Sequence, residues 1–537
     1  MSTSHDAGRL LPEVRTEPLG GGALVRALLG DEAPGWYEPL PRGTHGWATR
    51  AQEVRGGHAL RGWHGALAPA FAARGAAAER LARAADGAGI VVTTGQQPGL
   101  FGGPIYTWSK ALSALALADA IQATTGIPTA PVFWAATDDA DFVEAASTWI
   151  ALPTGAERLT LPQTPLEGRP MAEVPLGDVH DLLERLMAAA GSAAHRAPLE
   201  AAARSYAPDA TVGGAYVALL RELLEPLGIA VLDVSHPAAV AASAPVLRGA
   251  LDAATSLDEA VRERAAAIEA AGFDVQVPYV PGLTLVAART PDGGKTRVPL
   301  PDAARVAADV QAVLGTTVLL RPVVERVLLP TAAYVAGPGE LAYFAQVGAV
   351  ADAMGLPRPL AVPRWSCTIV EPHVARILER LGVRAEELAN PHAPERAVAQ
   401  RLLPAAVAGP IAELREAVQR AAASIGAGGA ALLPREVAEG FARQLAHRID
   451  RLERRYRAAV ARAGAAELRD LAAARGALQP GGVRQERALN LLPLLARHGP
   501  PLLDAMLDGA RMHAASLVGG AAEGAHGTRP AVEAAGR

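Results

Sequence analysis

One segment of about 45 residues limits the possible folds of this chain more than any other. Residues 89–94 form an apolar, β-branched run, and residues 95–104 are rich in turn formers. A periodic, Ala- and Leu-rich stretch follows at residues 106–124, and residues 130–136 form a second apolar run. This order predicts strand, loop, helix and strand. Because two strands joined through a helix run parallel, the segment predicts a βαβ unit in a parallel sheet.

The same alternation continues to about residue 385, which predicts a doubly wound α/β domain with helical insertions. A chain of 537 residues is too long for one core, so we expect at least two domains. Further strands are predicted at residues 229–233, 283–287, 327–329 and 360–362. Helices are predicted at residues 60–85, 179–190, 215–227 and 256–271. Residues 278–300, with a turn at Asp292-Gly-Gly294, are typical of a projecting β-hairpin.

Beyond residue 385 the strand signals end and helix formers dominate, chiefly at residues 411–424 and 435–475. Heptad spacing of four, three, four and three links Leu445, Ile449, Leu452, Tyr456 and Ala459. This short run fits either a coiled coil or an antiparallel helical hairpin. The arginines between residues 448 and 457 indicate a solvated face, a nucleotide phosphate site or an acidic partner surface. Residues 516–537 are predicted to be a disordered tail.

Composition excludes several classes of protein. Cys367 is the only cysteine, so the chain has neither an internal disulfide nor a cysteine-based zinc site, and we expect Cys367 to be a buried strand residue. No other metal-ligand spacing is present. The net charge of −4 gives no electrostatic case for a nucleic acid or an anionic membrane as partner. Without a signal-like start or a long apolar run, we expect a cytoplasmic protein.

The loop at residues 93–104 is the most informative stretch for function. Its four glycines, which include Gly99, Gly102 and Gly103, allow backbone N–H groups to approach a ligand. The helix that follows favours an anion at its N-terminus. Gln96 and Gln97 offer amide groups that suit a polar or zwitterionic ligand. The loop lacks the Walker and dinucleotide-binding patterns, and a tight structural turn is the alternative interpretation.

Carboxylates follow the second strand directly. Asp138, Asp139 and Asp141 are the candidate catalytic residues, because carboxylates at the edge of a sheet bind ammonium groups or magnesium, or accept a proton. The alternative is an aspartate-rich helix N-cap, which needs no function. Lys110, early in the preceding helix, is expected to be a surface charge unless the loop folds back over it.

Polar residues also end the later strands. Asp233 ends one strand, Gly337-Pro-Gly339 is a turn with Glu340 in the first helical turn, and Arg364 follows another strand. Such convergence of strand ends indicates a binding site. The candidate substrate-binding residues are Gln96, Gln97, Gly99, Gly102, Gly103, Tyr106, Trp134, Arg321, Gly337, Gly339, Glu340, Tyr343, Arg364 and Ser366.

At these residues the sequence resembles the BshC family, the cysteine ligases of bacillithiol synthesis. The resemblance runs in order from about residue 89 to 510. The first loop and the Gly-Pro-Gly-Glu turn are its specific motifs. The matching stretches are Thr94–Thr107, Pro131–Trp134 with Asp139 and Asp141, Leu320–Pro322, Gly337–Tyr343, Pro363–Ser366, Gln485–Arg487 and Arg497–Gly499.

The resemblance implies a Rossmann-like core over residues 1–385 with inserted connecting segments at about 151–225 and 240–316. It also implies a coiled-coil domain at residues 386–515, through which two chains form a homodimer. The implied reaction joins the carboxylate of cysteine to the amine of glucosaminyl-malate. ATP is the implied energy source, with Mg²⁺ as its companion.

The resemblance also implies roles for individual residues. Gln96, Gln97 and the glycines would line the floor of the pocket, Asp139 and Asp141 would face the amine, and Arg364 would face the malate carboxylates. The family usually has a histidine between the two aspartates, preceded by Glu, whereas this chain has Ala140 and Asp138. If that histidine carries the proton, this chain is impaired or uses another base. A same-fold ligase or nucleotidyltransferase for another amino acid and amine, and a non-catalytic dimeric binding protein, are the alternative functions.

Overall fold

The computed structural model divides the chain into two compact units. The larger unit comprises Val14–Thr148, Arg158–Thr368 and the chain from Asn490 onward, and the smaller unit comprises Trp149–Glu157 and Ile369–Leu489 together with the first residues. The described residues are 11–519, except 59, 61, 87–88, 164–165, 167, 391, 402–404, 429–433 and 464. The chain leaves the larger unit after Thr368, earlier than the expected boundary at residue 385, and it returns to the larger unit at Asn490.

The larger unit is built on a parallel sheet of five strands. Their order across the sheet is β11-β10-β2-β3-β6, with every neighbouring pair parallel. The chain therefore moves outward from β2 in one direction, then crosses back to β10, and reverses between those two strands. This order confirms the predicted Rossmann-like, doubly wound sheet. The strands are β2 (Ile90–Gln96), β3 (Thr129–Ala135), β6 (Ala230–Asp233), β10 (Thr331–Ala336) and β11 (Ala361–Pro363).

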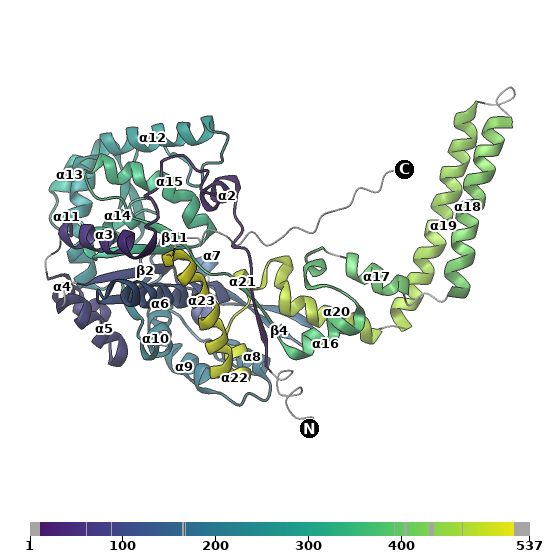
Figure 1. The fold of residues 1–537 in the computed structure, drawn as a ribbon, viewed down its shortest axis with the longest axis horizontal. Coiled ribbons are helices and arrows are strands. Elements are labelled where there is room, and N and C mark those ends of the chain that lie inside the picture. Colours follow the sequence, from purple (N-terminus) through teal and green to yellow (C-terminus); the bar gives the residue numbers. More distant parts are fainter. Residues whose placement is uncertain are drawn as a thin grey trace. The chain divides into compact units, whose positions relative to one another are not determined.

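Helix α6 (Ile105–Thr125), predicted at residues 106–124, is buried on every side because it is apolar all round. It packs on β2 and β3 and also against α23 (Pro500–Gly519), which comes from the far end of the chain (Figure 1). The first four residues of the predicted disordered tail thus belong to α23, and the remainder of that tail, residues 520–537, lies outside the described residues.

Three strands of the second insertion form a separate antiparallel sheet in the order β8-β7-β9. Its members are β7 (Leu283–Arg289), β8 (Lys295–Pro299) and β9 (Leu314–Thr316). The predicted hairpin is confirmed, since β7 and β8 pair on either side of Asp292-Gly-Gly294. The strand predicted at residues 327–329 is wrong: the first two of these residues belong to α14 (Arg321–Leu328), and Leu329 lies between α14 and β10. Pro322 favours a helix start, and the apolar run continues helically from there.

Helices cover both faces of the central sheet (Figure 1). The helices predicted at residues 179–190, 215–227 and 256–271 are found as α8 (His180–Ala190), α10 (Val212–Leu224) and α12 (Ala254–Ala270). The helix predicted at residues 60–85 is divided into two helices, Trp63–Phe71 and Gly75–Asp86. The other helices of this unit are α2 (Ala23–Leu29), α3 (Gly43–Gly56), α4 (Trp63–Phe71), α5 (Gly75–Asp86), α7 (Phe142–Ala145), α9 (Ala197–Ser205), α11 (Pro237–Asp252), α13 (Ala303–Ala308), α15 (Pro338–Ala353) and α22 (Leu492–His498). Within the described ranges, every helix is too short or too polar to span a bilayer.

The smaller unit is helical and has its own core. Val374, Leu378, Leu471 and Leu478 are buried together where α16 and α20 pack on each other. Its helices are α16 (Pro372–Leu381), α17 (Ala393–Arg401), α18 (Ala405–Gly428), α19 (Arg435–Ala463), α20 (Ala465–Leu478) and α21 (Gln485–Ala488). Three strands contain residues of both units: β4 (Ser147–Leu152), β5 (Gly155–Thr160) and β12 (Cys367–Val370).

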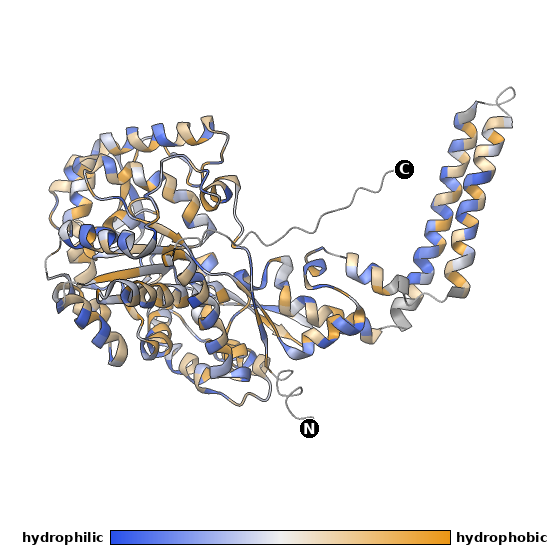
Figure 2. Cartoon of the chain, viewed as in Figure 1, coloured by the Kyte–Doolittle hydropathy of each residue, from blue (hydrophilic) through white to orange (hydrophobic). Residues whose placement is uncertain are grey.

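The heptad run lies on α19, which pairs with its neighbour α18 as a helical hairpin. Figure 1 shows the two helices side by side, and Figure 2 shows hydrophobic and hydrophilic residues alternating along both. Ile449 is buried in the pair, whereas the side chains of Leu452 and Tyr456 are exposed. Arg415 of α18 forms ion pairs with Asp450 and Glu453 of α19, so charged residues also join the two helices.

Candidate functional site

The candidate site lies where the strand order reverses, at the carboxyl ends of β2 and β10. Open α/β sheets bind ligands at this switch point. β2 ends in Gly95 and Gln96, and β10 leads into α15 through Gly337. Pro338 occupies the first turn of α15, where a missing N–H group costs nothing. The backbone N–H of Gly337 donates to Oε2 of Glu340 at 2.7 Å, which fixes the carboxylate over the helix start.

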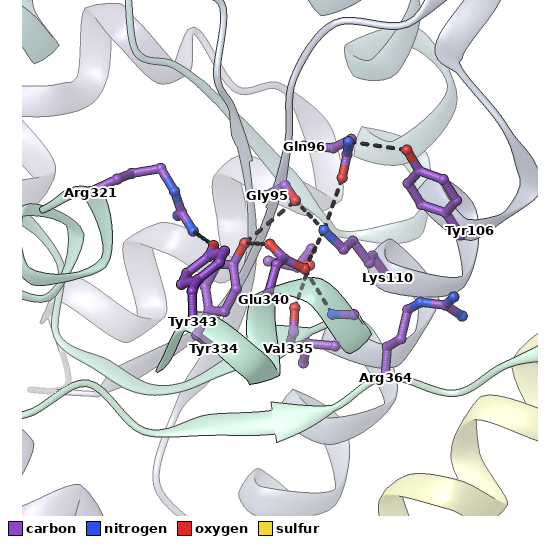
Figure 3. Close-up of polar contacts among 12 residues, drawn as sticks. Gly95, Gln96, Tyr106, Lys110, Arg321, Tyr334, Val335, Glu340, Tyr343 and Arg364 are labelled. Carbon is purple, nitrogen blue, oxygen red and sulfur yellow. Dashed lines mark hydrogen bonds and ion pairs between the residues drawn. The ribbon is translucent and has the colours of Figure 1, made fainter. Parts of the chain in front are cut away.

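Lys110 is at the centre of this site, contrary to the expectation of a surface charge. Its Nζ forms an ion pair with Oε2 of Glu340 at 2.5 Å and donates to the carbonyl oxygen of Gly95 at 2.8 Å and Oε1 of Gln96 at 2.9 Å (Figure 3). The residue is only 3% exposed because α6 is buried on every side. The hydroxyl of Tyr334 donates to the other oxygen of Glu340.

Arg321 brings a second buried charge to the same end of the sheet. It donates to the hydroxyl of Tyr343 at 3.0 Å and to Oε2 of Glu325 at 3.1 Å. The other oxygen of Glu325 accepts a hydrogen bond from the hydroxyl of Thr93 on β2. Figure 3 shows Arg321 and Tyr343 beside the Lys110–Glu340 pair. These buried charges are hydrogen-bonded partners, as an apolar interior requires.

Burial and neighbouring charges set the protonation of the two carboxylates. Burial alone would raise the pKa of Glu340, but Lys110 and Arg321 outweigh it and hold the pKa below its usual range. For Glu325, burial outweighs the opposing effect of Arg321 and raises the pKa to about 7. The site therefore contains one carboxylate that stays ionised and one that takes up a proton near neutral pH.

The raised pKa of Glu325 predicts a pH-dependent stability. Between pH 4.5 and 7 the folded state retains a proton that the unfolded state has released, so stability falls as pH rises. The free energy of unfolding of the wild type should fall by roughly 3 kcal/mol between these pH values because of Glu325. Glutamine cannot titrate, so the Glu325→Gln variant should not show this fall. Urea unfolding of both proteins at pH 5 and pH 8 measures the change. Equal pH dependence in the two proteins would refute it.

The glycines of the β2–α6 loop are explained by packing within the loop. The N–H of Gly102 donates to the carbonyl oxygen of Gly99, and the N–H of Gly103 to that of Leu100. A Cβ on Gly99 would lie 2.8 Å from the Cα of Gly103, and Gly102 and Gly103 both have positive φ. Tyr206 bonds to the same loop. This geometry favours the structural-turn interpretation of these three glycines over direct contact with a ligand.

Gln96 and Gln97 link this loop to the acidic segment, which is the run of carboxylates at residues 138–144 after β3. Gln96 Nε2 donates to the hydroxyl of Tyr106 at 3.2 Å, and Gln97 Nε2 donates to Oε2 of Glu144 at 2.5 Å. The hydroxyl of Tyr106 also lies 3.4 Å from Oε1 of Glu144. Glu144, which was not among the residues expected from the sequence, thus joins the two candidate loops.

The three candidate catalytic aspartates have different surroundings. The carboxylate of Asp141 caps α7 by accepting from the N–H of Glu144, so the N-cap interpretation holds for this residue. Asp139 accepts from the N–H of Asp141 at 2.7 Å, and burial raises the pKa of Asp139. Asp138 forms an ion pair with Lys295 at 2.7 Å. Among the described residues, no three His, Cys, Asp or Glu side chains are grouped to hold a metal ion.

The remaining candidates lie around the switch point or on its border. Arg364 donates to the carbonyl oxygen of Trp365 at 2.8 Å. Its Cζ lies over the ring of Tyr106, 5.9 Å from the ring centroid. A Cβ on Gly337 would make ordinary contacts with Glu340, Arg364 and Lys110, so Gly337 lies at the centre of the site, whereas Gly339 faces open space. Ser366 is buried. Trp134 on β3 borders the cavity described below.

Comparison with known proteins agrees with this architecture. A family model described as the N-terminal Rossmann-like domain of bacillithiol biosynthesis BshC matches residues 66–282 and 305–365. A second model, described as the C-terminal coiled-coil domain of BshC, matches residues 367–515. The chain belongs to the BshC family. The BshC match to the Rossmann-like domain contains the switch point and the acidic segment, whereas Lys295 lies between its two matched ranges.

Relatives in the BshC family match most of the chain. A protein from Symbiobacterium thermophilum is 30% identical over 557 residues, which cover 93% of this chain and 96% of the relative. One from Solibacter usitatus is 30% identical over 450 residues, covering 78% and 82%. One from Koribacter versatilis is 30% identical over 464 residues, covering 80% and 83%. Each relative is named "Putative cysteine ligase BshC".

Proposed function

We propose that this BshC-family ligase joins L-cysteine to the amine of glucosaminyl-malate, and so forms the amide bond of bacillithiol. The observation that supports the proposal best is the cluster of Lys110, Arg321 and Arg364 at the switch point of a chain in this family. Lys110 pairs with Glu340 there, and Arg321 pairs with Glu325. Such a site suits the carboxylates and phosphates that the reaction brings together.

Amide formation from a free carboxylate needs an energy source, and we propose ATP. The cationic side chains at the switch point fit a polyanion, and the start of α15 adds the positive end of a helix dipole. Magnesium bound to phosphates takes only one or two protein carboxylates, which the acidic segment after β3 offers. Bound ATP would activate the cysteine carboxylate. The chain would hold the anionic groups of the substrates through Lys110, Arg321 and Arg364.

The attacking amine must lose a proton, and we propose Asp139 as the acceptor. Burial raises the pKa of its carboxyl group, which brings it closer to the pH of the cell and makes it a better base. Asp139 adjoins Ala140, where the family usually has histidine. Glu144 is the second candidate, because it reaches Gln97 and Tyr106 on the neighbouring loop.

Mass spectrometry of the products tests the function. Purified protein with cysteine, glucosaminyl-malate, ATP and magnesium should yield a product heavier than glucosaminyl-malate by one cysteinyl residue. The Asp139→Asn variant should lose about 100-fold or more in rate, as expected for a lost proton acceptor. A product with another amino acid or amine would support the alternative ligase. Binding of substrates without ATP consumption would support the non-catalytic binding protein.

The homodimer through α18 and α19 is a further part of the proposal. Leu452, Tyr456 and Phe441 of α19 have exposed side chains, at 43%, 43% and 61%, and a second chain would cover such residues. Light scattering of the full chain should give about twice the 55.3 kDa mass. Replacing all three residues with glutamate should give the monomer, and a monomeric wild type would contradict the proposal.

A further inference from the structure

A small cavity lies beside the end of β3, apart from the cation cluster of the switch point. It has a volume of about 140 Å³, and α11 and the β7–β8–β9 sheet form its walls. This volume is below the roughly 300–1,000 Å³ of sites for drug-sized ligands, so the cavity suits a ligand the size of one amino acid. One wall is apolar, with Val240 and Leu247 from α11 and Leu314 from β9.

Two ion pairs line the cavity on its polar side. Lys295 Nζ donates to Oδ2 of Asp138 at 2.7 Å and to the backbone carbonyl oxygen of Asp138 at 3.1 Å. Arg289 forms an ion pair with Glu173. Both signs of charge are therefore present side by side, which is the arrangement that recognises the ammonium and carboxylate groups of a zwitterion.

Some hydrogen-bonding groups on this side of the cavity are only partly used by the described residues. The indole Nε1 of Trp134 is buried and has no acceptor among the described residues. Within the same described set, the structure gives Oδ1 of Asp138 no donor and gives Lys295 Nζ only acceptors on Asp138. A ligand that supplies a donor for Oδ1 of Asp138 and an acceptor for Nζ of Lys295 would use this remaining capacity and be stabilised there.

The identity of Lys295 is itself informative. The chain has 51 lysines and arginines, and only two of them, Lys110 and Lys295, are lysines. Both are shielded and each pairs with a carboxylate. A Cβ on Gly315 would lie 2.8 Å from Cε of Lys295, so the lysine stem passes directly over the backbone of β9. A compact ammonium on a slim stem fits this position, whereas a guanidinium is a broader, planar group with a different set of donors.

We propose that this cavity is the binding site for free L-cysteine. The carboxylate of cysteine faces Lys295 and Arg289, its ammonium faces Asp138 and Glu173, and its thiol side chain lies between Trp134 and the apolar wall. This inference rests on the proposed ligase function. The cavity and the switch point lie at the same edge of the sheet, because Trp134 of β3 pairs with Gly95 of β2, whose carbonyl oxygen accepts from Lys110.

Calorimetry with L-cysteine under reducing conditions tests the site in the full chain. Lys295→Met should weaken cysteine binding roughly 10- to 100-fold, as expected for a lost charged hydrogen bond. Lys295→Arg should fail to restore it. Trp134→Phe replaces the indole with a smaller ring that has no N–H group, and it should weaken binding about 5-fold. Arg305→Met, which breaks an exposed pair with Asp302 in the same insertion, is the matched control and should bind like the wild type.

Analogues of cysteine test which charged group of the ligand contacts which residues of the cavity. Cysteamine lacks the carboxylate, and N-acetylcysteine lacks the ammonium, so both should bind the wild type at least 10-fold more weakly than cysteine. Cysteamine should bind Lys295→Met and the wild type equally, because the group that Lys295 contacts is absent. An equal loss of cysteine and cysteamine affinity in Lys295→Met would overturn the assignment.

Nuclear magnetic resonance adds a readout that does not depend on activity. Labelling with ¹⁵N-lysine marks only two side-chain nitrogens, and the Lys295→Met variant assigns them. Cysteine should shift the Lys295 signal and leave that of Lys110 in place. A cysteine-induced shift of Lys110 alone, or no cysteine binding to the wild type, would overturn the proposal. If cysteine binds as described but no product forms, the ligase function fails and the site stands.

Discussion

Replacing Lys110 with methionine should lower the free energy of unfolding by about 3–5 kcal/mol and abolish ligation. The variant leaves Glu340 buried without its ionic partner, and breaking a buried pair on one side costs this much. The carbonyl oxygen of Gly95 and the amide of Gln96 also lose their donor. Urea unfolding gives the change in stability, and the product assay gives the change in activity.

The double variant Lys110→Met/Glu340→Gln is the matched control. It removes both charges, so it should be more stable than Lys110→Met although it contains one more substitution. It should still lack activity, because the cation cluster is incomplete. The single variant Glu340→Gln completes the comparison. If the stability losses of Lys110→Met and Glu340→Gln add up to that of the double variant, the ion pair has no coupling energy and the buried-pair interpretation is wrong.

A chain that ends after Gly499 should lose the cooperative unfolding of the larger unit. The truncation removes α23, whose buried residues pack against α6 in the middle of that unit. The buried side chains of Leu502, Met506 and their neighbours are lost with the helix. Each such burial contributes about 1.5–3 kcal/mol, so the loss is a large part of the total stability of a domain. Calorimetry and solubility of the truncated chain measure the loss.

Two further variants serve as controls for the truncation after Gly499. A chain that ends after residue 519 retains all of α23 and should unfold like the wild type. Gly509→Val keeps the helix but places a Cβ 2.4 Å from the buried ring of Trp365, so it should destabilise by about 1–3 kcal/mol through overpacking. A truncation after Gly499 that unfolds like the full chain would show that α23 is not part of the core.

Much of the fold was predictable because the strands of the central sheet are short apolar runs. β2, β3, β6 and β11 were expected at their observed places, and the helices between them follow from helical periodicity. Residues 327–329 were assigned wrongly because a short apolar run fits both a strand and a buried helix. The return of α22 and α23 to the larger unit has no signal in the sequence, because their pattern resembles that of the other C-terminal helices.

The candidate site was predictable to the extent that parallel strands bring their carboxyl ends to one edge. Gln96, Glu340 and Arg364 were therefore expected together, and the structure places them around the switch point. Lys110 was missed as a site residue, although a lysine on a helix that is apolar all round has no surface to reach. Lys295 was missed because its partner is 157 residues away, and spacing in the sequence does not report such pairs.

The packing of α23 on α6 also has a consequence for synthesis of the chain. About 375 residues separate the two helices, which at roughly 5–20 residues per second amounts to about 20–75 s on the ribosome. Throughout that time the nascent Rossmann-like unit lacks the helix that covers one side of α6. Chaperones therefore have a defined apolar target on every growing chain, and premature termination yields a product whose core cannot close.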